Sequence, residues 1–425
     1  MKRSDHGVSR KNIDRDALYV MQHLNRNGFK AYLVGGSVRD LMLGRMPKDF
    51  DISTDAEPQQ IRRLFRNCFL VGRRFRLAHI RFGRDKVIET STFRRQPEPN
   101  QSEESLVQWD DNQFGTPEED AFRRDFTING LFYDLHDFSV IDHVGGLPDL
   151  KRKLIRTIGD PNIRFREDPV RMVRAVRFAG RLGFRLESRT RRAILKHADE
   201  VLQSSPARLL DEMYKLFAFS SSAASFRSLW DLGLMQPLLP EIAAYVKATG
   251  GRKSPLWSCL GALDRWSEGN AMASPELLLA VLLHGPMLQA CRAADACRHP
   301  NVVCTEWLEP FALRFRMPKG VRYRVLRLVE NQIRLEQLVG RGEAVDMRRK
   351  GVLRMLEHAS FPDSLALLRI RCASGAVLPE VVSFWEESVA QAPARILDAS
   401  GGEVQAPDRP RRRRRRRRRR PSHEA

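Results

Sequence analysis

The sequence predicts an α+β protein, with a head of mixed strands and helices followed by a helical body and a basic tail. From residue 13 to 150, short segments with strand alternation intervene between helical patterns. From residue 151 to about 390 the strand signals fade and helical periodicity dominates. Ten consecutive arginines then occupy residues 411–420. Because such a block of like charge cannot bury apolar surface, we expect the tail to be disordered.

These patterns divide the chain into five expected segments. They are a polar arm (1–12), the head (13–150), a helical neck (151–220), a helical body (221–390) and the tail (391–425). Strands are expected at 31–34, 50–52, 69–71, 77–82, 87–92, 128–134 and 140–143, and helices at 38–43 and 58–65. Residues 96–118 are polar and aperiodic, which is typical of a long loop or lid.

The charge of the chain points to a polyanionic partner. Lysine and arginine number 73 against 52 acids, which gives a formal net charge of +21. Residues 391–425 carry only +8 of this, so the excess extends beyond the tail. Arginine outnumbers lysine 60 to 13. Guanidinium groups bind phosphate bidentately and stack on bases, although a codon bias would explain the scattered arginines equally well.

Several classes of protein are excluded. Apolar content of 42% with 29% charged residues suits a globular chain. The longest apolar run, 277–283, is too short for a membrane span. The polar N-terminus does not resemble a signal peptide, and six cysteines without a C-x-x-C pair favour a reducing cytoplasm. The cluster of Cys291, Cys297, His299 and Cys304 lacks the pair spacing of a zinc site, so we expect ordinary helical or loop residues there.

Gly35 and Gly36 form the first candidate site, because they join an expected strand to an expected helix. Glycine lets backbone approach a ligand closely, and the start of a helix offers unpaired N–H groups to phosphate. Arg39 lies in the first turn of that helix and would add positive charge. A purely structural turn is the alternative.

Asp49 and Asp51 follow on the next expected strand. Side chains two residues apart on a strand point the same way, so the two carboxylates would project together. Oxygen ligands beside a phosphate-binding turn suit Mg²⁺, and paired metal ions can assist phosphoryl displacement. The alternative is a pair of solvated strand-end acids. Glu89, on a later strand, could be a third metal ligand or an exposed residue, and the sequence does not decide.

Two arginines and two polar residues form a third cluster, at Arg123, Arg124, Asp125 and Asn129. Such a set could bind triphosphate and ribose, with Asp125 orienting an arginine or taking part in metal or nucleotide positioning. A salt-bridged surface turn is the alternative.

A helix is expected over residues 169–182, between the Asp168-Pro169 start signal and the Gly183 stop signal. Arg174, Arg177 and Arg181 share one of its faces, which would line a cleft or simply be solvated. Asp168 and Arg171 lie one turn apart. An acid and an arginine together can pair with a base edge, although helix capping alone would explain Asp168.

In order along the chain, the motifs at 33–52, 123–130 and 167–184 resemble those of the class II nucleotidyltransferases, which are bacterial poly(A) polymerases and tRNA CCA-adding enzymes. The resemblance implies a polymerase-β-type head followed by a helical neck and body. It implies that Asp49 and Asp51 bind two Mg²⁺ ions and are catalytic, with Asp125 as the third essential acid. Binding of the ATP triphosphate is implied for Gly35, Gly36, Arg39 and Arg124, and base reading for Asp168 and Arg171 with Arg174 nearby.

Residues 69–80 resemble the stretch that marks the poly(A) polymerase branch, whereas residues 142–150 fit both branches. We therefore expect a cytoplasmic, template-independent poly(A) polymerase that adds AMP from ATP to RNA 3′ ends in mRNA processing or decay. Arg177 and Arg181 are expected to contact RNA, and His79 to be structural. A CCA-adding enzyme and a non-catalytic RNA-binding protein are the alternatives. Recruiting partners, oligomeric state and the role of the arginine run stay open.

Overall fold

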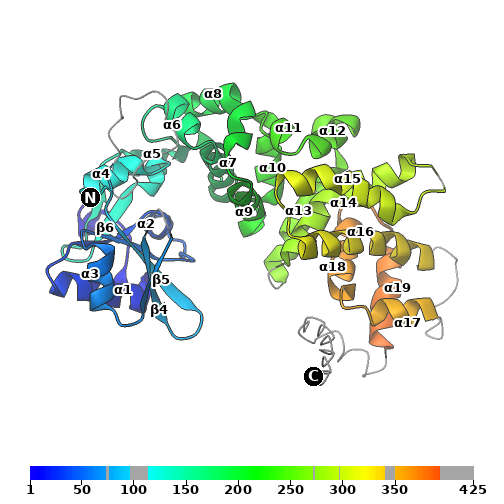
Figure 1. Cartoon of the computed structure of the whole chain (residues 1–425), viewed down its shortest axis with the longest axis horizontal. Coiled ribbons are helices and arrows are strands. Elements are labelled where there is room, and N and C mark those ends of the chain that lie inside the picture. The colour runs from blue at the N-terminus through cyan, green and yellow to red at the C-terminus, as the bar shows by residue number, and fades with distance from the viewer. Residues whose placement is uncertain (73–75, 96–112, 271–272, 296, 340–349, 393–425) are drawn as a thin grey trace, which may run out of the picture.

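The computed structural model describes residues 1–425 except 73–75, 96–112, 271–272, 296, 340–349 and 393–425. The chain forms an arch with a strand-containing head at one end and a helical body at the other (Figure 1). This arrangement confirms the predicted α+β class. The predicted disorder of the tail falls outside the described residues.

The head is built on a seven-stranded mixed sheet in the order β3-β4-β5-β2-β1-β6-β7. Neighbouring strands are antiparallel except β2 and β5, which are parallel. The strands are β1 (Ala31–Val34), β2 (Asp51–Thr54), β3 (Cys68–Val71), β4 (Leu77–Phe82), β5 (Lys86–Thr92), β6 (Leu131–Asp134) and β7 (Val140–Asp142).

The predicted strands are all present, with two informative differences. Strand β2 begins at Asp51 and continues to Thr54, so Asp49 precedes the strand that was expected to carry it. The expected strand at 128–134 is a 3-10 turn, η3 (Thr127–Asn129), followed by β6. The turn is tight, since a Cβ at Gly130 would lie 2.5 Å from Cγ2 of Val144.

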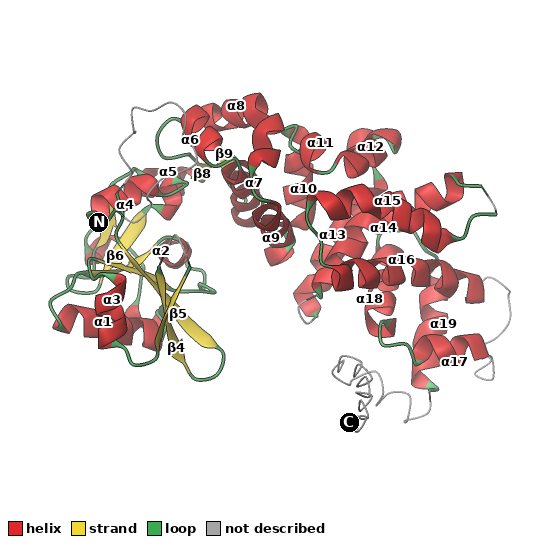
Figure 2. Ribbon diagram, viewed as in Figure 1, coloured by secondary structure: helices red, strands yellow, loops and turns green. Residues whose placement is uncertain are grey.

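Helices α1 and α3 lie against the head sheet, and the hairpin of β4 and β5 projects from it (Figure 2). Most of the expected loop at 96–118 lies outside the described residues. The loop ends earlier than expected, because α4 begins at Pro117, after a capping box formed by Thr116 and Glu119. The helices of the head are α1 (Arg15–Arg26), α2 (Gly36–Met42), α3 (Pro58–Leu64), α4 (Pro117–Arg123) and α5 (Gly146–Arg152).

Beyond the head, the described residues form helices and connecting loops, apart from one short parallel pair, β8 (Leu154–Ile155) with β9 (Arg185–Leu186), which the sequence analysis missed. Many helices start with proline in the first turn, where no N–H is needed. They are α6 (Pro161–Glu167), α7 (Val170–Leu182), α8 (Ser188–His197), α9 (Pro206–Leu216), α10 (Ser222–Asp231), α11 (Met235–Leu238), α12 (Pro240–Ala248), α13 (Pro255–Gly269), α14 (Pro275–Ala293), α15 (Pro300–Arg314), α16 (Lys319–Val339), α17 (Lys350–Leu356), α18 (Phe361–Ala373) and α19 (Pro379–Ala390).

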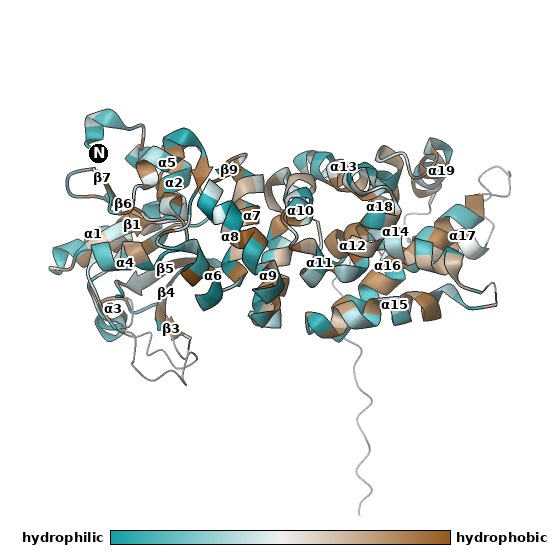
Figure 3. Ribbon diagram, turned by 90° about the horizontal axis from the view of Figure 1, so that it is seen from above, coloured by the Kyte–Doolittle hydropathy of each residue, from teal (hydrophilic) through white to brown (hydrophobic). Residues whose placement is uncertain are grey.

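Hydrophobic and hydrophilic residues alternate around these helices (Figure 3), and the hydrophobic faces form a core that continues from the head into the body. A second cluster surrounds Trp385 near the C-terminal helices. The apolar run at 277–283 lies in α14 and is buried almost throughout. In the part of the chain that is described, no helix is both long and apolar enough to cross a bilayer.

Candidate active site

The turn between β1 and α2 requires glycine at position 35. Gly35 has φ +70° and ψ −127°, which side-chain-bearing residues rarely adopt. A Cβ at Gly35 would also lie 2.9 Å from Nη1 of Arg124. Ser37 closes the turn by donating from Oγ to the carbonyl of Val34 at 2.9 Å. The turn therefore brings backbone and the Arg124 guanidinium together, as phosphate binding would require.

Asp51 lies at the start of β2, beside the parallel strand β5. Because Ile52 pairs with Thr90, Asp51 and Glu89 reach the same level of adjacent strands. Asp51 is exposed, but the surrounding protein still displaces water, which raises its pKa. The charge of Glu89 raises it further, Arg124 lowers it and Asp49 raises it, with a net pKa of about 6. The predicted acids thus share one electrostatic environment.

These acids suit a cation chemically. Carboxylate oxygens are preferred Mg²⁺ ligands, and the like charges of Asp51, Glu89 and Asp49 oppose one another. Among the described residues, however, no group of three or more His, Cys, Asp or Glu side chains is arranged to hold a metal ion. The magnesium site therefore stays a prediction. His79 on β4 lies opposite Glu89, with Nε2 3.7 Å from Oε1.

Arg124 lies between the glycine turn and the acids. Its Nη2 donates to Asp120 at 2.9 Å and to Ser53 Oγ at 3.3 Å, and its guanidinium lies 5.2 Å from the centre of the Phe132 ring. Its main-chain carbonyl accepts a hydrogen bond of 2.8 Å from Arg164, a residue that the sequence analysis did not single out. Arg124 is thus held in place on several sides.

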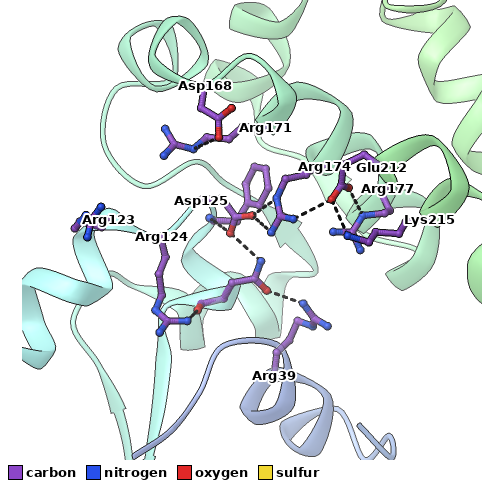
Figure 4. A network of polar contacts seen from close by, with 12 residues as sticks. Arg39, Arg123, Arg124, Asp125, Asp168, Arg171, Arg174, Arg177, Glu212 and Lys215 are labelled. Atoms are coloured by element: carbon purple, nitrogen blue, oxygen red, sulfur yellow. Dashed lines mark hydrogen bonds and ion pairs between the residues drawn. The ribbon is translucent and has the colours of Figure 1, made fainter. Parts of the chain in front are cut away.

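Asp125 occupies the centre of a polar network (Figure 4). Arg174 donates to its Oδ2 from Nε at 2.9 Å and from Nη2 at 2.7 Å, and Asn129 donates to its Oδ1 at 2.9 Å. Burial raises the pKa of Asp125, but the Arg174 charge and these hydrogen bonds outweigh burial and lower the pKa to about 2. Both carboxylate oxygens are therefore engaged within the protein.

Arg39 is enclosed within the head. Its Nε donates to Asp40 at 2.9 Å, its Nη1 donates to Asn129 at 2.6 Å, and its guanidinium lies 5.1 Å from the centre of the Phe178 ring. Only 1% of the residue is exposed. These contacts make Arg39 a support behind the glycine turn, and its expected contact with phosphate stays a prediction.

The arginine stripe of α7 is paired with buried acids, so the solvated-face alternative does not describe it. Arg174 and Arg177 both donate to Glu212 of α9, at 3.1 and 2.8 Å. Arg181 donates to Asp40 at 2.7 Å and lies over the Phe219 ring. The expected RNA contacts of Arg177 and Arg181 stay predictions. Glu212 was missed because it is more than 30 residues away in sequence.

Asp168 is joined to a residue that the sequence analysis also missed. Arg208 of α9 donates to its two carboxylate oxygens at 2.9 and 2.8 Å. The side chain of Asp168 does not cap α7, which starts at Val170 and ends before Gly183 as expected. Arg171 lies beside it, with Nε 3.9 Å from Oδ2. The structure therefore brings the predicted base-reading pair together and adds Arg208.

The cysteine cluster is split between two helices and a loop. Cys291 and Cys304 have their sulfur atoms 3.4 Å apart, and Cys297 is exposed. His299 accepts from the N–H of Asn301 at 3.2 Å and so caps α15. These residues make ordinary helical and loop contacts.

Comparison with known proteins matches three family descriptions along the chain. They are "Poly A polymerase head domain" (residues 31–156), "Probable RNA and SrmB- binding site of polymerase A" (183–246) and "Polymerase A arginine-rich C-terminus" (303–420). The chain is 39% identical to Poly(A) polymerase I of Escherichia coli O6:H1, over 96% of this chain and 90% of the relative. It is 36% identical to a CCA-adding enzyme of Geobacillus thermodenitrificans, over 69% of this chain and 68% of the relative.

Solved structures show the same fold. The CCA-adding enzyme of Bacillus stearothermophilus in complex with CTP superimposes with a TM-score of 0.64 at 28% identity, covering 88% of this chain and 81% of the other. Fold and site together define a nucleotidyltransferase of the class that contains poly(A) polymerases and CCA-adding enzymes. Within that class, the chain belongs to the bacterial poly(A) polymerase family. It is thus an enzyme rather than a non-catalytic RNA-binding protein.

Proposed function

We propose that the protein adds AMP from ATP to RNA 3′ ends without a template and releases pyrophosphate, in cytoplasmic mRNA processing or decay. The observation that carries this proposal is the share of the chain that each kind of relative matches. Poly(A) polymerase I relatives match over 91–96% of the chain, whereas the CCA-adding relative of Geobacillus thermodenitrificans matches over 69%. We further propose the division at residues 12, 150, 220 and 390 into arm, head, neck, body and tail.

Asp49 and Asp51 would hold two Mg²⁺ ions, and Glu89, at the level of Asp51 on the adjacent strand, would be a further ligand. When bound, these ions would align the RNA 3′-oxygen with the α-phosphorus of ATP and neutralise the charge of the leaving pyrophosphate. Asp51 must lose its proton before it can accept a cation, and with a pKa of about 6 its carboxylate is already mostly ionised at neutral pH.

The triphosphate would lie at the turn of Gly35 and Gly36. There Arg124 would supply positive charge to the phosphate oxygens, because its Nη1 lies beside the turn, 2.9 Å from where a Cβ of Gly35 would stand. Arg39 and Asn129 would hold the turn from behind. Asp125 would act by fixing Asn129 and Arg174 rather than by binding metal, because its two oxygens are already engaged.

The base of ATP would be read by Asp168 and Arg171, with Arg174 nearby. The double contact from Arg208 fixes the orientation of the Asp168 carboxylate, and a fixed set of donors and acceptors discriminates between base edges. Arg208 therefore joins the residues proposed for nucleotide selection.

The proposal is tested by measuring pyrophosphate release from ATP in the presence of an unstructured RNA. Release is expected to require RNA, ATP and Mg²⁺ and to stop when EDTA is added. Release that continues at the same rate in EDTA would contradict the metal assignment, and the absence of any release would contradict the proposed reaction.

The second candidate is a CCA-adding enzyme, which the shared fold and the CCA-adding relative favour. It would use the same chemistry with CTP and ATP on tRNA. Incubation with a tRNA that lacks its CCA end separates the two candidates, since a CCA-adding enzyme would add three nucleotides and then stop.

A further inference from the structure

A pocket of about 680 Å³, separate from the candidate active site, lies where the head meets the neck. Helices α4, α6 and α8 contribute residues to it, and α6 and α8 lie side by side in Figure 1. Its lining includes none of the residues assigned above to metal, triphosphate or base. A volume of this size is within the range of ligand sites, so the pocket is a candidate for a separate ligand.

One face of α8 supplies positive charge to the pocket. Arg189, Arg192 and Lys196 line it and are exposed, and their spacing of three and four residues places them on the same side of the helix. Within the described chain none of the three forms an ion pair with an acid, and Arg192 donates only to the carbonyl of Ser188 in its own helix, at 3.4 Å.

The acids in the lining are already used by backbone groups. Asp160 accepts from the N–H of Asn162 at 2.9 Å, and Glu187 accepts from the N–H of Thr190 at 2.9 Å. The fourth cation of the lining, Arg156, is paired with Asp149 at 2.8 Å. With four cations and two acids in its lining, the pocket carries an excess of positive charge.

Phe122 of α4 adds an aromatic surface to the same pocket. It lines the pocket and is 47% exposed, so its ring is available to a ligand. Cationic grooves combined with exposed aromatic rings are typical of single-stranded nucleic-acid binding, in which arginine and lysine bind phosphates and rings stack on bases.

We propose that this pocket binds single-stranded RNA away from the reacting 3′ end, with phosphates on Arg189, Arg192 and Lys196 and a base against Phe122. The proposal rests on the proposed function of an RNA-tailing enzyme. The three cations extend over about 10 Å of helix, more than a single phosphate needs, which favours a strand over a free nucleotide. The family description that covers 183–246 names RNA binding but no residues.

The test measures binding of a 24-nucleotide RNA by fluorescence anisotropy at several salt concentrations. An Arg189→Ala/Arg192→Ala/Lys196→Ala variant is expected to reduce the slope of log Kd against log salt by about 2, since each phosphate contact on a single strand contributes about 0.7. Phe122→Ala is expected to weaken binding about tenfold. Thermal unfolding confirms that each variant is folded.

The matched control is Arg166→Ala/Arg185→Ala/Arg191→Ala, which removes the same charge from exposed positions outside the pocket. An equal change of slope in both triple variants, or no change in the α8 variant, would overturn the proposal. A second measurement titrates ADP into the α8 variant and the unaltered protein. If the variant loses ADP binding but binds RNA as before, the pocket binds a free nucleotide, and the RNA proposal is overturned.

A separate assay measures how fast the enzyme extends a six-nucleotide RNA primer with ATP. It tests the proposed reaction independently of RNA binding in the pocket. We expect the α8 variant to extend this primer at the normal rate, because so short an RNA does not need the second site. If the unaltered enzyme fails to extend the primer, the proposed reaction fails, whereas the anisotropy result still decides the pocket.

Discussion

Asp51 and Asp125 are two acids of one site in opposite electrostatic settings. Asp51 has Glu89 and Asp49 as neighbours of like charge, and its pKa is raised to about 6. Asp125 has Arg174 and two N–H donors, and its pKa is lowered to about 2. The first arrangement leaves repulsion that a bound cation would relieve, whereas the second is complete within the protein. The comparison teaches that the carboxylate of Asp125 is satisfied by protein groups, whereas that of Asp51 keeps like-charged neighbours, as the proposed metal site requires.

Removing Asp49 and Asp51, the acids with like-charged neighbours, should have the largest effect on activity. An Asp49→Ala/Asp51→Ala variant is expected to lose at least about a thousandfold in the rate of AMP addition, because the charge that would hold the metal is gone. Its thermal stability should be unchanged or higher, since like charges have been removed. Primer extension and thermal unfolding measure the two effects. Asp85→Ala, which alters an exposed acid of the β4–β5 turn, is the control. A double variant that still extends RNA with ATP at a normal rate would contradict the role given to these acids.

Breaking the ion pairs of Glu212 with Arg174 and Arg177 should instead lower the free energy of unfolding. Glu212→Gln leaves Arg174 and Arg177 without their shared counter-charge. Removal of one partner from a buried ion pair costs about 3 kcal/mol, so we expect a loss of that size in denaturant unfolding. Asp211→Asn on the same helix is the matched control, because Asp211 is 62% exposed in its side chain and pairs only with Lys215 among the described residues. Equal destabilisation by both variants would show that burial of the network contributes nothing.

The stability supplied by Asp125 should depend on pH. Its pKa is about 2 in the folded protein against an ordinary value of 3.8, so the ionised form is favoured by folding. The corresponding stability, about 2 kcal/mol, is fully present above pH 4 and is lost as the pH falls toward 2. Asp125→Asn removes it. Urea unfolding at pH 5, 4 and 3 should show the gap between the unaltered protein and this variant shrinking with acid. A constant gap would mean that Asp125 is not held ionised by its partners.

The smallest expected effect concerns nucleotide choice. Arg208→Ala removes the two hydrogen bonds that fix Asp168. Because the side chain of Arg208 is 56% exposed, the pair is screened by water and modest in strength. We expect the preference for ATP over CTP, taken as the ratio of kcat/KM values, to fall about fivefold with little change in stability. Arg171→Lys should lower the same ratio, and an unchanged ratio in both variants would remove this pair from base selection.

The sequence was sufficient for the strands of the head and for the segments of the site, because alternation and turn residues are local signals. It marked Gly35, Asp51 and Arg124 as site residues, and the structure brings these three together. Asp168 lies in the same part of the molecule as Arg124 and Asp125 (Figure 4). It could not supply Glu212 or Arg208, since nothing local marks a partner that arrives from α9. For the same reason the sequence did not show that the arginine stripe of α7 pairs with Glu212 and Asp40.

Arg39 illustrates a second limit. Its position in the first turn after two glycines predicts a phosphate contact, but it did not show that Asp40, Asn129 and the ring of Phe178 surround the guanidinium. A charge pattern shows where a side chain starts, whereas its final direction depends on which residues distant in the sequence pack around it.

Extension of one unstructured RNA with each nucleoside triphosphate separately is the measurement that tests the central claim most directly. The RNA should have no tRNA features, and the product lengths should be resolved nucleotide by nucleotide. The account predicts long tails with ATP alone and little or no extension with CTP, UTP or GTP. Products that stop after a few nucleotides, or that form only on tRNA with CTP and ATP together, would contradict it.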